Sequence, residues 1–121
     1  MIKNLPMKRH IFLLAALCIS CSNSAKFEVF NQSNVSVDSV TISNGTDLLK
    51  LKEIRPGQSQ IRILKFSTDT NGDGNYQAQV WIKKTYLRSK FGYYNNGIPN
   101  GSKYDVSIKK DTIIVNEKFS F

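Results

Sequence analysis

The sequence predicts an all-β domain: an antiparallel β-sandwich of about seven short strands, immunoglobulin-like or transthyretin-like, with a small β-barrel as the alternative. Two observations predict this fold class. From Lys26 onward, apolar residues recur with a period of two, and no stretch keeps the helical period over about ten residues. Segments rich in Asn, Asp, Gly and Pro interrupt the alternation, as turns do. The chain has 121 residues, 40% of them hydrophobic, which suits one domain with its own core.

The expected strands follow one another along the chain with polar turns between them. They span residues 27–30, 35–43, 48–52, 60–67, 76–86, 103–109 and 112–121. Turn-forming residues fill 31–34, 44–47, 55–58 and 71–74. A tight turn at Lys110-Asp111 is expected to join the last two strands. The alternation is clearest in strand 103–109, where Tyr104, Val106 and Ile108 would face the core.

Two of these strands change phase midway, because their apolar residues switch from odd to even positions. An extra residue or a bend reverses the face to which side chains point. We therefore expect a bulge or a bend near Asp38-Ser39 and another near Ile63-Leu64.

The N-terminus has the features of an export signal. Lys8, Arg9 and His10 precede a nine-residue apolar run, 11–19, that contains no charge. The run is too short for a membrane-spanning helix, which needs about 20 residues. It has the length of the apolar part of a secretory signal peptide, about 7–15 residues.

Residues 7–22 resemble bacterial lipoprotein signals, in which a small residue precedes an acceptor cysteine. Ser20 matches the small position and Cys21 the acceptor, while Cys18 stands where the family usually has Leu. The resemblance implies removal of residues 1–20, acylation of Cys21 and insertion of the acyl chains in the lipid bilayer. Residues 21–25 would form a short tether to the domain at 26–121. Ser22 rather than Asp after the acceptor implies the bacterial outer membrane; the alternative is an ordinary signal peptide with incidental cysteines.

The composition excludes several kinds of catalysis. The single His and both Cys lie within the first 21 residues, so the expected mature domain has neither a Ser/His or Cys/His nucleophile nor a His/Cys zinc site. No Gly-rich phosphate-binding loop is present, and nothing in the spacing of the nine Asp and Glu residues indicates a catalytic pair. We expect a protein that is not an enzyme, with a carboxylate-dependent hydrolase as the least favoured alternative. The formal charge of +8 comes from 17 basic and nine acidic residues, and nucleic acid is not expected as a partner of an exported domain.

One segment resembles the first half of the calcium loops of EF-hand and dockerin proteins. In 69–75, Asp69, Asn71 and Asp73 occupy the first, third and fifth positions, and the carbonyl of Asn75 would be a fourth ligand. Val80 stands where the bidentate carboxylate belongs. The sequence therefore predicts at most a weak calcium site, and no other cofactor. The alternative is a hairpin loop whose Asn, Asp and Gly residues serve its conformation.

The expected strand 76–86 has a polar outward face that carries the only Trp. The inward set is Tyr76, Ala78, Val80 and Ile82, and the outward set is Gln77, Gln79, Trp81 and Lys83. Basic and aromatic residues interleave after it as far as Tyr93 and Tyr94, at the start of a turn-rich loop, 92–102. Such a face can stack on sugar rings and pair with phosphates or carboxylates. The alternative is an ordinary sheet surface, whose aromatic residues stabilise the strands and whose lysines prevent edge-to-edge aggregation.

Together these features predict a membrane-anchored envelope lipoprotein that acts as a non-enzymatic binding or assembly module for an envelope glycan or protein. The alternative is a structural domain that docks to a larger envelope complex, with a weak calcium-ordered loop.

Overall fold

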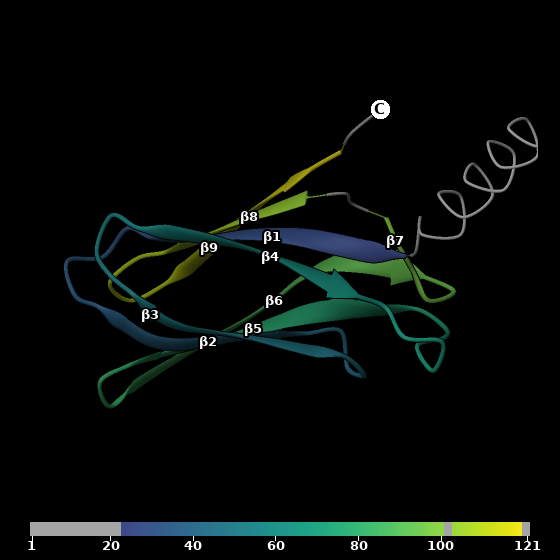
Figure 1. Cartoon of the computed structure of the whole chain (residues 1–121), viewed down its shortest axis with the longest axis horizontal. Helices are drawn as coiled ribbons and strands as arrows, with labels where there is room; N and C mark the ends of the chain where they lie inside the picture. The colour runs from purple at the N-terminus through teal and green to yellow at the C-terminus, as the bar shows by residue number, and fades with distance from the viewer. Residues whose placement is uncertain (1–22, 101–102, 120–121) are drawn as a thin grey trace, which may run out of the picture.

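The computed structural model describes residues 23–100 and 103–119, which form two packed β-sheets (Figure 1). This confirms the expected all-β sandwich, with nine strands in the described residues rather than seven. The strands are β1 (Ser24–Asn31), β2 (Val37–Ser43), β3 (Leu48–Ile54), β4 (Ser59–Lys65), β5 (Gly74–Ile82), β6 (Thr85–Asn95), β7 (Ile98–Pro99), β8 (Lys103–Ile108) and β9 (Ile113–Lys118). Within this part of the chain, no helix is long and apolar enough to cross a membrane.

One sheet has the strand order β4-β1-β8-β9 and the other the order β3-β2-β5-β6-β7. Neighbouring strands are antiparallel except β1 and β8, which run parallel. The first two strands therefore lie in different sheets, and the connection between them crosses from one layer to the other.

The core lies between the sheets and follows the predicted alternation. All four residues of the expected inward set of strand 76–86 are buried, as are Tyr104, Val106 and Ile108 of β8. Aromatic rings are close neighbours in this core: the Tyr76 ring lies 5.3 Å from that of Phe27 and 5.1 Å from that of Tyr104. Such edge-to-face and tilted contacts add about 0.5–1.5 kcal/mol a pair beyond the area that they bury.

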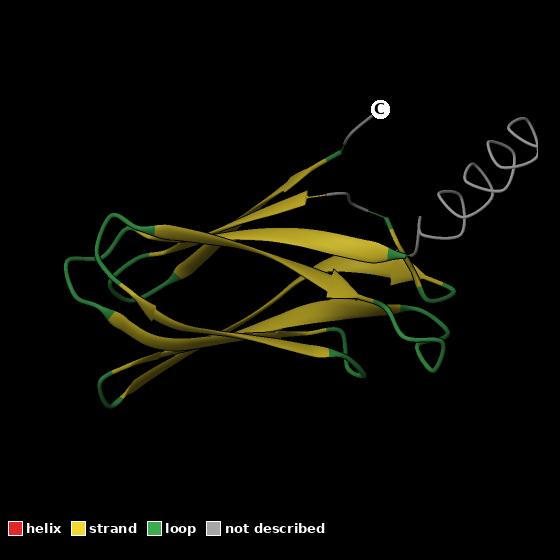
Figure 2. Ribbon diagram, viewed as in Figure 1, coloured by secondary structure: helices red, strands yellow, loops and turns green. Residues whose placement is uncertain are grey.

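The loops gather at the two ends of the sandwich (Figure 2). We call the end at which β1 begins the near end; its described loops are 44–47, 66–73 and 96–97. We call the opposite end the far end; its loops are 32–36, 55–58, 83–84 and 109–112. Figure 1 shows the near end at the right and the far end at the left.

Asn31 joins three segments at the far end. Its side chain is fully buried, and Nδ2 donates to the carbonyls of Val35 and Ile54, both at 2.8 Å. Its Oδ1 accepts from the backbone N–H of Ser33 at 2.9 Å and from the Ser33 hydroxyl at 2.6 Å. Its backbone N–H donates to the Gln58 carbonyl at 3.0 Å. Asn31, which the sequence analysis placed in a turn, therefore connects several segments of the far end through its hydrogen bonds.

The expected strand 76–86 is two strands, because the chain reverses at Lys83 and Lys84. Lys83 adopts a left-handed φ of 53°, a conformation that a non-Gly residue enters at a cost. Its backbone N–H donates to Oδ2 of Asp38 at 2.7 Å, which helps to stabilise the turn.

The expected loop 92–102 is partly strand. β6 continues to Asn95 and turns back into β7 through Asn96 and Gly97, which have φ values of 52° and 71°. These left-handed values are typical of a two-residue Asn-Gly hairpin.

One of the two expected bends is present. Val37 and Val40 are both buried, so β2 changes face between them, and the paired β3 changes face at the same place, where Glu53 has a φ of 49°. The bend expected near Ile63-Leu64 is wrong. The register between β1 and β4 is unbroken, and Ile61 and Ile63 point outward, with 47% and 58% of their surfaces exposed.

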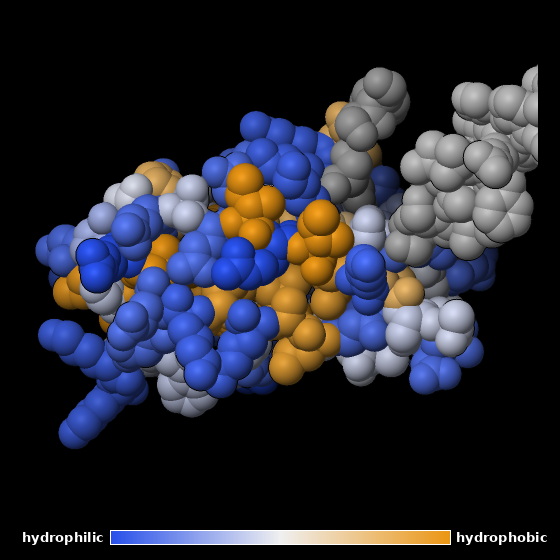
Figure 3. Space-filling view, in the orientation of Figure 1, coloured by the Kyte–Doolittle hydropathy of each residue, from blue (hydrophilic) through white to orange (hydrophobic). Residues whose placement is uncertain are grey.

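Apolar side chains reach the surface along one side of the sandwich. Figure 3 shows a hydrophobic area in the middle of the face it presents, over β3 and β4. The exposed large apolar residues of these two strands are Leu48, Ile61 and Ile63. β3 and β4 are both edge strands of their sheets, so this surface lies at an open side of the sandwich.

Candidate functional site

The outward residues predicted for β5 lie on the outer surface of the five-stranded sheet. The neighbouring strand β6 places further side chains beside them. Three cross-strand pairs lie side by side. They are Gln77 with Lys90, Gln79 with Arg88, and Trp81 with Tyr86. We call these six residues the candidate face. Because these residues lie on two paired strands rather than on a loop, the strand register sets their spacing.

Trp81 and Tyr86 form an exposed aromatic pair at the far-end side of the candidate face. Their ring centroids lie 4.4 Å apart with an interplanar angle of 42°, and the residues are 43% and 37% exposed. The Arg88 guanidinium carbon lies 5.9 Å from the centre of the Tyr86 ring, within range of a cation–π contact. The pair therefore presents apolar ring surface to solvent beside a cation.

A polar hollow of about 190 Å³ lies at the opposite side of the candidate face. It is lined by Ser43, Gly45, Asn75, Tyr76, Gln77 and Lys90. Gln77 and Lys90 thus belong both to the hollow and to the candidate face, which makes the polar surface continuous from the hollow to the aromatic pair.

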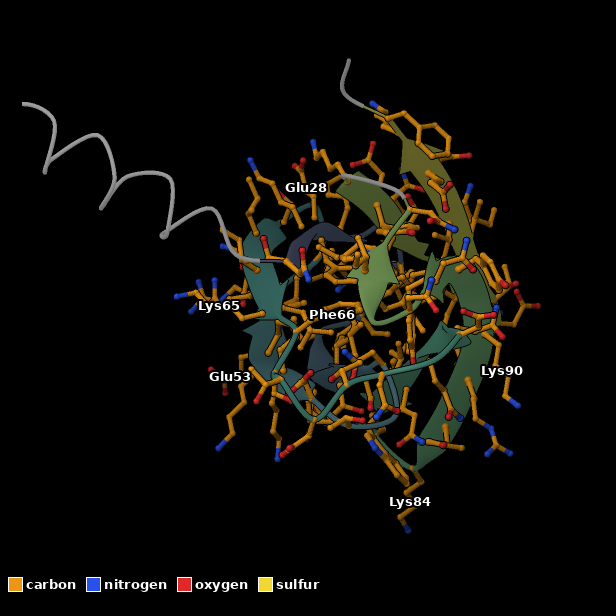
Figure 4. The ribbon with its side chains drawn as sticks, turned by 90° about the vertical axis from the view of Figure 1, so that its right-hand side faces the viewer. Glu28, Glu53, Lys65, Phe66, Lys84 and Lys90 are labelled. Atoms are coloured by element: carbon orange, nitrogen blue, oxygen red, sulfur yellow. The ribbon has the colours of Figure 1, made fainter. Side chains whose placement is uncertain are left out.

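Positive charge extends across the same surface of the sheet. Lys50 and Lys52 of β3 pair with Thr41 and Ser39 of β2. Those residues pair in turn with Gln79 and Trp81 of β5. Basic side chains therefore flank the central hydroxyl and amide groups on both sides. Viewed from the near end, Lys84 and Lys90 point outward from the β5–β6 side, whereas Phe66 points between the sheets (Figure 4).

Three of the residues expected on this face lie elsewhere. Lys83 is in the hairpin turn, next to the aromatic pair but outside the strand register. Tyr93 is exposed on β6, beyond a register shift opposite Gly74 and Tyr76.

Tyr94 does not lie on the outward face on which the sequence analysis expected it. It is 6% exposed, and its hydroxyl donates to the Asn44 carbonyl at 2.6 Å in the core. The register shift explains this position, since the extra residue in β6 turns Tyr94 inward and Tyr93 outward.

The loop expected to bind calcium is held by protein contacts. Asp73 Oδ1 accepts from the Asn96 N–H at 3.0 Å, and Asn75 Nδ2 donates to the Gly92 carbonyl at 2.6 Å. Asp69 and Asn71 are exposed. Over 23–100 and 103–119, no group of three or more His, Cys, Asp or Glu side chains is placed to hold a metal. Calcium binding at 69–75 stays a prediction.

Asp47 is the residue that ties this loop to the rest of the near end, and sequence reasoning missed it. Its Oδ2 accepts from the Thr70 hydroxyl at 2.8 Å, from the Ser67 N–H at 3.0 Å and from Asn44 Nδ2 at 3.0 Å. Burial alone would raise the pKa of the Asp47 carboxyl. The hydrogen bonds that Ser67, Asn44 and Thr70 donate to the carboxylate outweigh burial and lower this pKa to about 2.

We expect Asp47 to make folding stability depend on acid pH. The folded pKa lies below the ordinary value near 3.9, so the stabilisation is complete above about pH 4 and is lost as the pH falls towards 2. Urea unfolding of the wild type and of Asp47→Asn at a series of pH values measures this. The variant should be less stable at pH 7 and lose less stability between about pH 4 and 2. The matched control is Asp111→Asn, at an exposed far-end carboxylate, which should behave as the wild type.

A second hollow, of about 320 Å³, lies on the outer surface of the other sheet and contains two carboxylates. Glu28 and Asp105 face each other across β1 and β8. Lys103 Nζ lies 2.9 Å from Glu28 Oε1 and 3.4 Å from Asp105 Oδ1, and Lys118 Nζ lies 3.0 Å from Asp105 Oδ2. The hydrogen bond from Lys118 lowers the pKa of Asp105, against the opposing effect of burial. Asp105 is therefore held ionised, which is unlike the raised pKa that a general acid needs.

The expected lipidation site, Cys21, lies outside the described residues, as does the whole signal at 1–20. Of the residues expected to form the tether, 21–25, the described ones begin at Asn23, and Ser24 and Ala25 belong to β1.

Comparison with known proteins gives one structural likeness. The sequence matches no protein-family model and no curated protein. The structure is similar to an NMR structure of a protein from Eubacterium rectale, with a TM-score of 0.55 and 13% sequence identity. The match covers 81% of this chain and 91% of that chain. At this identity the likeness shows that the two chains share their fold.

Proposed function

We propose that the chain is a lipid-anchored protein of the bacterial envelope, in the outer membrane, whose sandwich is a non-enzymatic binding module for an envelope glycan. The observation that carries the binding proposal is the exposed Trp81–Tyr86 pair, with ring centroids 4.4 Å apart, beside amide and basic side chains in register. Aromatic rings offer apolar faces to the C–H surfaces of sugars, and amides hydrogen-bond hydroxyl groups in either direction. The anchor is proposed from the resemblance of residues 7–22 to lipoprotein signals.

We further propose a transthyretin-like rather than an immunoglobulin-like topology. A constant-type immunoglobulin domain places its first, second, fifth and fourth strands in one sheet. Here β1 and β2 lie in different sheets, and β1 lies between β4 and β8. This order supports the transthyretin-like member of the two alternatives.

The ion pairs of Glu28 and Asp105 support a protein that is not an enzyme. Lys103 lies 2.9 Å from Glu28 and Lys118 lies 3.0 Å from Asp105, so both carboxylates are engaged with lysines of their own sheet. The candidate face itself contains no carboxylate. Binding through hydrogen bonds, charge and ring stacking is the chemistry that these groups supply.

We expect Trp81→Ala to abolish most of the binding while leaving the fold intact. An aromatic side chain that becomes buried against its ligand contributes about 2 kcal/mol or more to binding. Its removal should therefore lower the affinity roughly 30-fold. An exposed cross-strand pair stabilises a sheet by only about 0.2–1 kcal/mol, so the melting temperature should fall little. The measurement is retention of the full-length protein, purified from membranes in detergent, on insoluble cell-wall glycan.

Ile114→Ala is the matched control, since Ile114 is also 43% exposed but lies on β9 of the other sheet. It should be retained as the wild type. Retention of Trp81→Ala equal to that of the wild type would show that the candidate face is not the binding surface. Incorporation of labelled palmitate, lost in Cys21→Ser, tests the anchor in the same preparations.

A further inference from the structure

We infer that the ligand is an anionic glycan, carrying carboxylate or phosphate groups, and that the far end of the sandwich provides the charged half of its binding surface. This inference rests on the proposed function, because it names the ligand class for the candidate face and extends that face to the loops beside it.

The charges of the loops differ between the two ends. The far-end loops carry five exposed basic residues and one carboxylate, Asp111, and two further exposed carboxylates, Asp38 and Glu53, lie on the adjoining strands. The basic residues are Arg55, Lys83, Lys84, Lys109 and Lys110. The described near-end loops carry Asp47, Asp69 and Asp73 and no basic residue. None of the five far-end cations forms an ion pair within the described ranges, so their charge is available to a ligand.

The basic loops are held in fixed positions, which favours a binding surface over a set of independent lysines. Asn31 accepts from the Gly57 N–H at 2.9 Å through its carbonyl, and Gln32 donates to the Ile108 carbonyl at 2.8 Å. These bonds connect the end of β1 to loop 55–58, and loop 32–36 to the end of β8, where loop 109–112 begins. Asp38 holds the Lys83–Lys84 hairpin through its bond to the Lys83 N–H. A surface ordered before binding loses less entropy when the ligand arrives.

The basic loops are continuous with the candidate face. Only one cross-strand pair, Ile82 with Thr85, separates the Trp81–Tyr86 pair from the Lys83–Lys84 turn. The aromatic pair therefore borders the far end. Arg88 and Lys90 carry positive charge along the face away from this end, and Lys50 and Lys52 do so on β3. A chain-like ligand lying along β5 and β6 would therefore meet the amides, then the Trp81–Tyr86 pair and then the basic loops.

The position of these loops argues against the membrane surface as the anionic partner. The described chain begins at Asn23 at the near end, and Cys21 precedes it by two positions. An acyl group on Cys21 would hold the near end at the bilayer, where the described loops are acidic and the adjoining strands carry the exposed lysines Lys26 and Lys65. The basic far end would then face away from the membrane, towards a polymer rather than a lipid head group. The amide and hydroxyl groups of the face match the many hydroxyl groups of a glycan.

The experiment compares two double charge reversals in the full-length protein. Lys84→Glu with Lys110→Glu changes the far end and avoids Lys83, whose backbone holds the turn. Lys26→Glu with Lys65→Glu changes two exposed lysines on the other sheet at the near end, with the same change in net charge. The probes are oligogalacturonate, which carries carboxylates, a glycerol phosphate polymer, a neutral malto-oligosaccharide and oligothymidylate. The readout is the dissociation constant by calorimetry at low and high salt.

We expect the wild type to bind one of the two anionic glycan probes at least about tenfold more tightly than the neutral one, and salt to weaken that binding. The far-end variant should lose about tenfold in affinity, and the near-end variant less than about twofold. Equal losses in both variants, equal affinity for the neutral probe, or equally tight binding of oligothymidylate would overturn the inference.

The two proposals can fail separately. Binding of the neutral probe that disappears in Trp81→Ala but not in the far-end variant would overturn the anionic ligand and support the candidate face. If the far-end variant loses affinity and Trp81→Ala does not, the proposed role of the Trp81–Tyr86 pair is overturned and binding by the basic far-end loops is supported.

Discussion

Replacing Asn31 with Ala is expected to lower the free energy of unfolding by about 4 kcal/mol. The Asn31 amide is the hydrogen-bond partner of the Val35 and Ile54 carbonyls and of the Ser33 N–H. The Val35 carbonyl also accepts from the Ser33 hydroxyl, whereas the Ile54 carbonyl and the Ser33 N–H lose their side-chain partner. Each buried polar group left without a partner costs about 1–3 kcal/mol, and Ala can neither donate to nor accept from these two. A domain of this size has only about 5–15 kcal/mol of stability in all, so the loss should be large. Urea unfolding followed by circular dichroism measures it.

Asn34→Ala is the matched control, because Asn34 lies in the adjoining loop 32–36 but is exposed. It should change the stability by less than about 0.5 kcal/mol. A midpoint for Asn31→Ala that equals the wild-type value would contradict the assignment of Asn31 as the residue that organises the far end. The same variant should also weaken anionic glycan binding if its loops no longer hold their positions.

Gly92→Ala is expected to destabilise the domain by about 3 kcal/mol for two separate reasons. Gly92 has a φ of +67°, which costs a non-Gly residue about 1 kcal/mol. A Cβ at this position would lie 2.8 Å from the Tyr76 ring and 2.9 Å from the Tyr104 ring. Both rings are fully buried, so they cannot move away without disturbing the core, and overpacking of this kind costs about 1–3 kcal/mol.

Gly72→Ala separates these two causes. Gly72 has a similar φ of +72°, but a Cβ there would meet nothing within 4 Å. Its substitution should therefore cost only the backbone part, about 1 kcal/mol. Equal melting temperatures for the two variants would show that the contact with the tyrosine rings adds nothing.

Strand alternation predicted the parts of the fold that depend on residues close in sequence. β5 and β8 each bury one face and expose the other, so the period of two identified the inward residues of both and the outward position of Trp81. The same pattern failed at Ile61 and Ile63, because apolar side chains also occupy the exposed surface of the edge strand β4.

The errors came from contacts between residues far apart in the chain. Lys83 and Lys84 carry no turn signal, and the acceptor that holds their hairpin, Asp38, is 45 residues away. The six-residue candidate face depends on this hairpin, since it brings Tyr86, Arg88 and Lys90 beside β5. The second error is the loop expected over 92–102. Its Asn96-Gly97 dipeptide is a typical hairpin signal and could have predicted the turn between β6 and β7. The register shift that buries Tyr94 had no such signal in the sequence.

The parallel pairing of β1 with β8 restricts the order in which the domain can assemble. Lys26 to Asn31 lie against Lys103 to Ile108, so the first strand acquires its second neighbour only when β8, near the C-terminal end of the sequence, has emerged. A chain synthesised from its N-terminus must therefore leave one side of β1 unpaired during most of its synthesis. Completion of that sheet is a late step, and chaperones or proteases that recognise open strand edges can act on the chain throughout this interval.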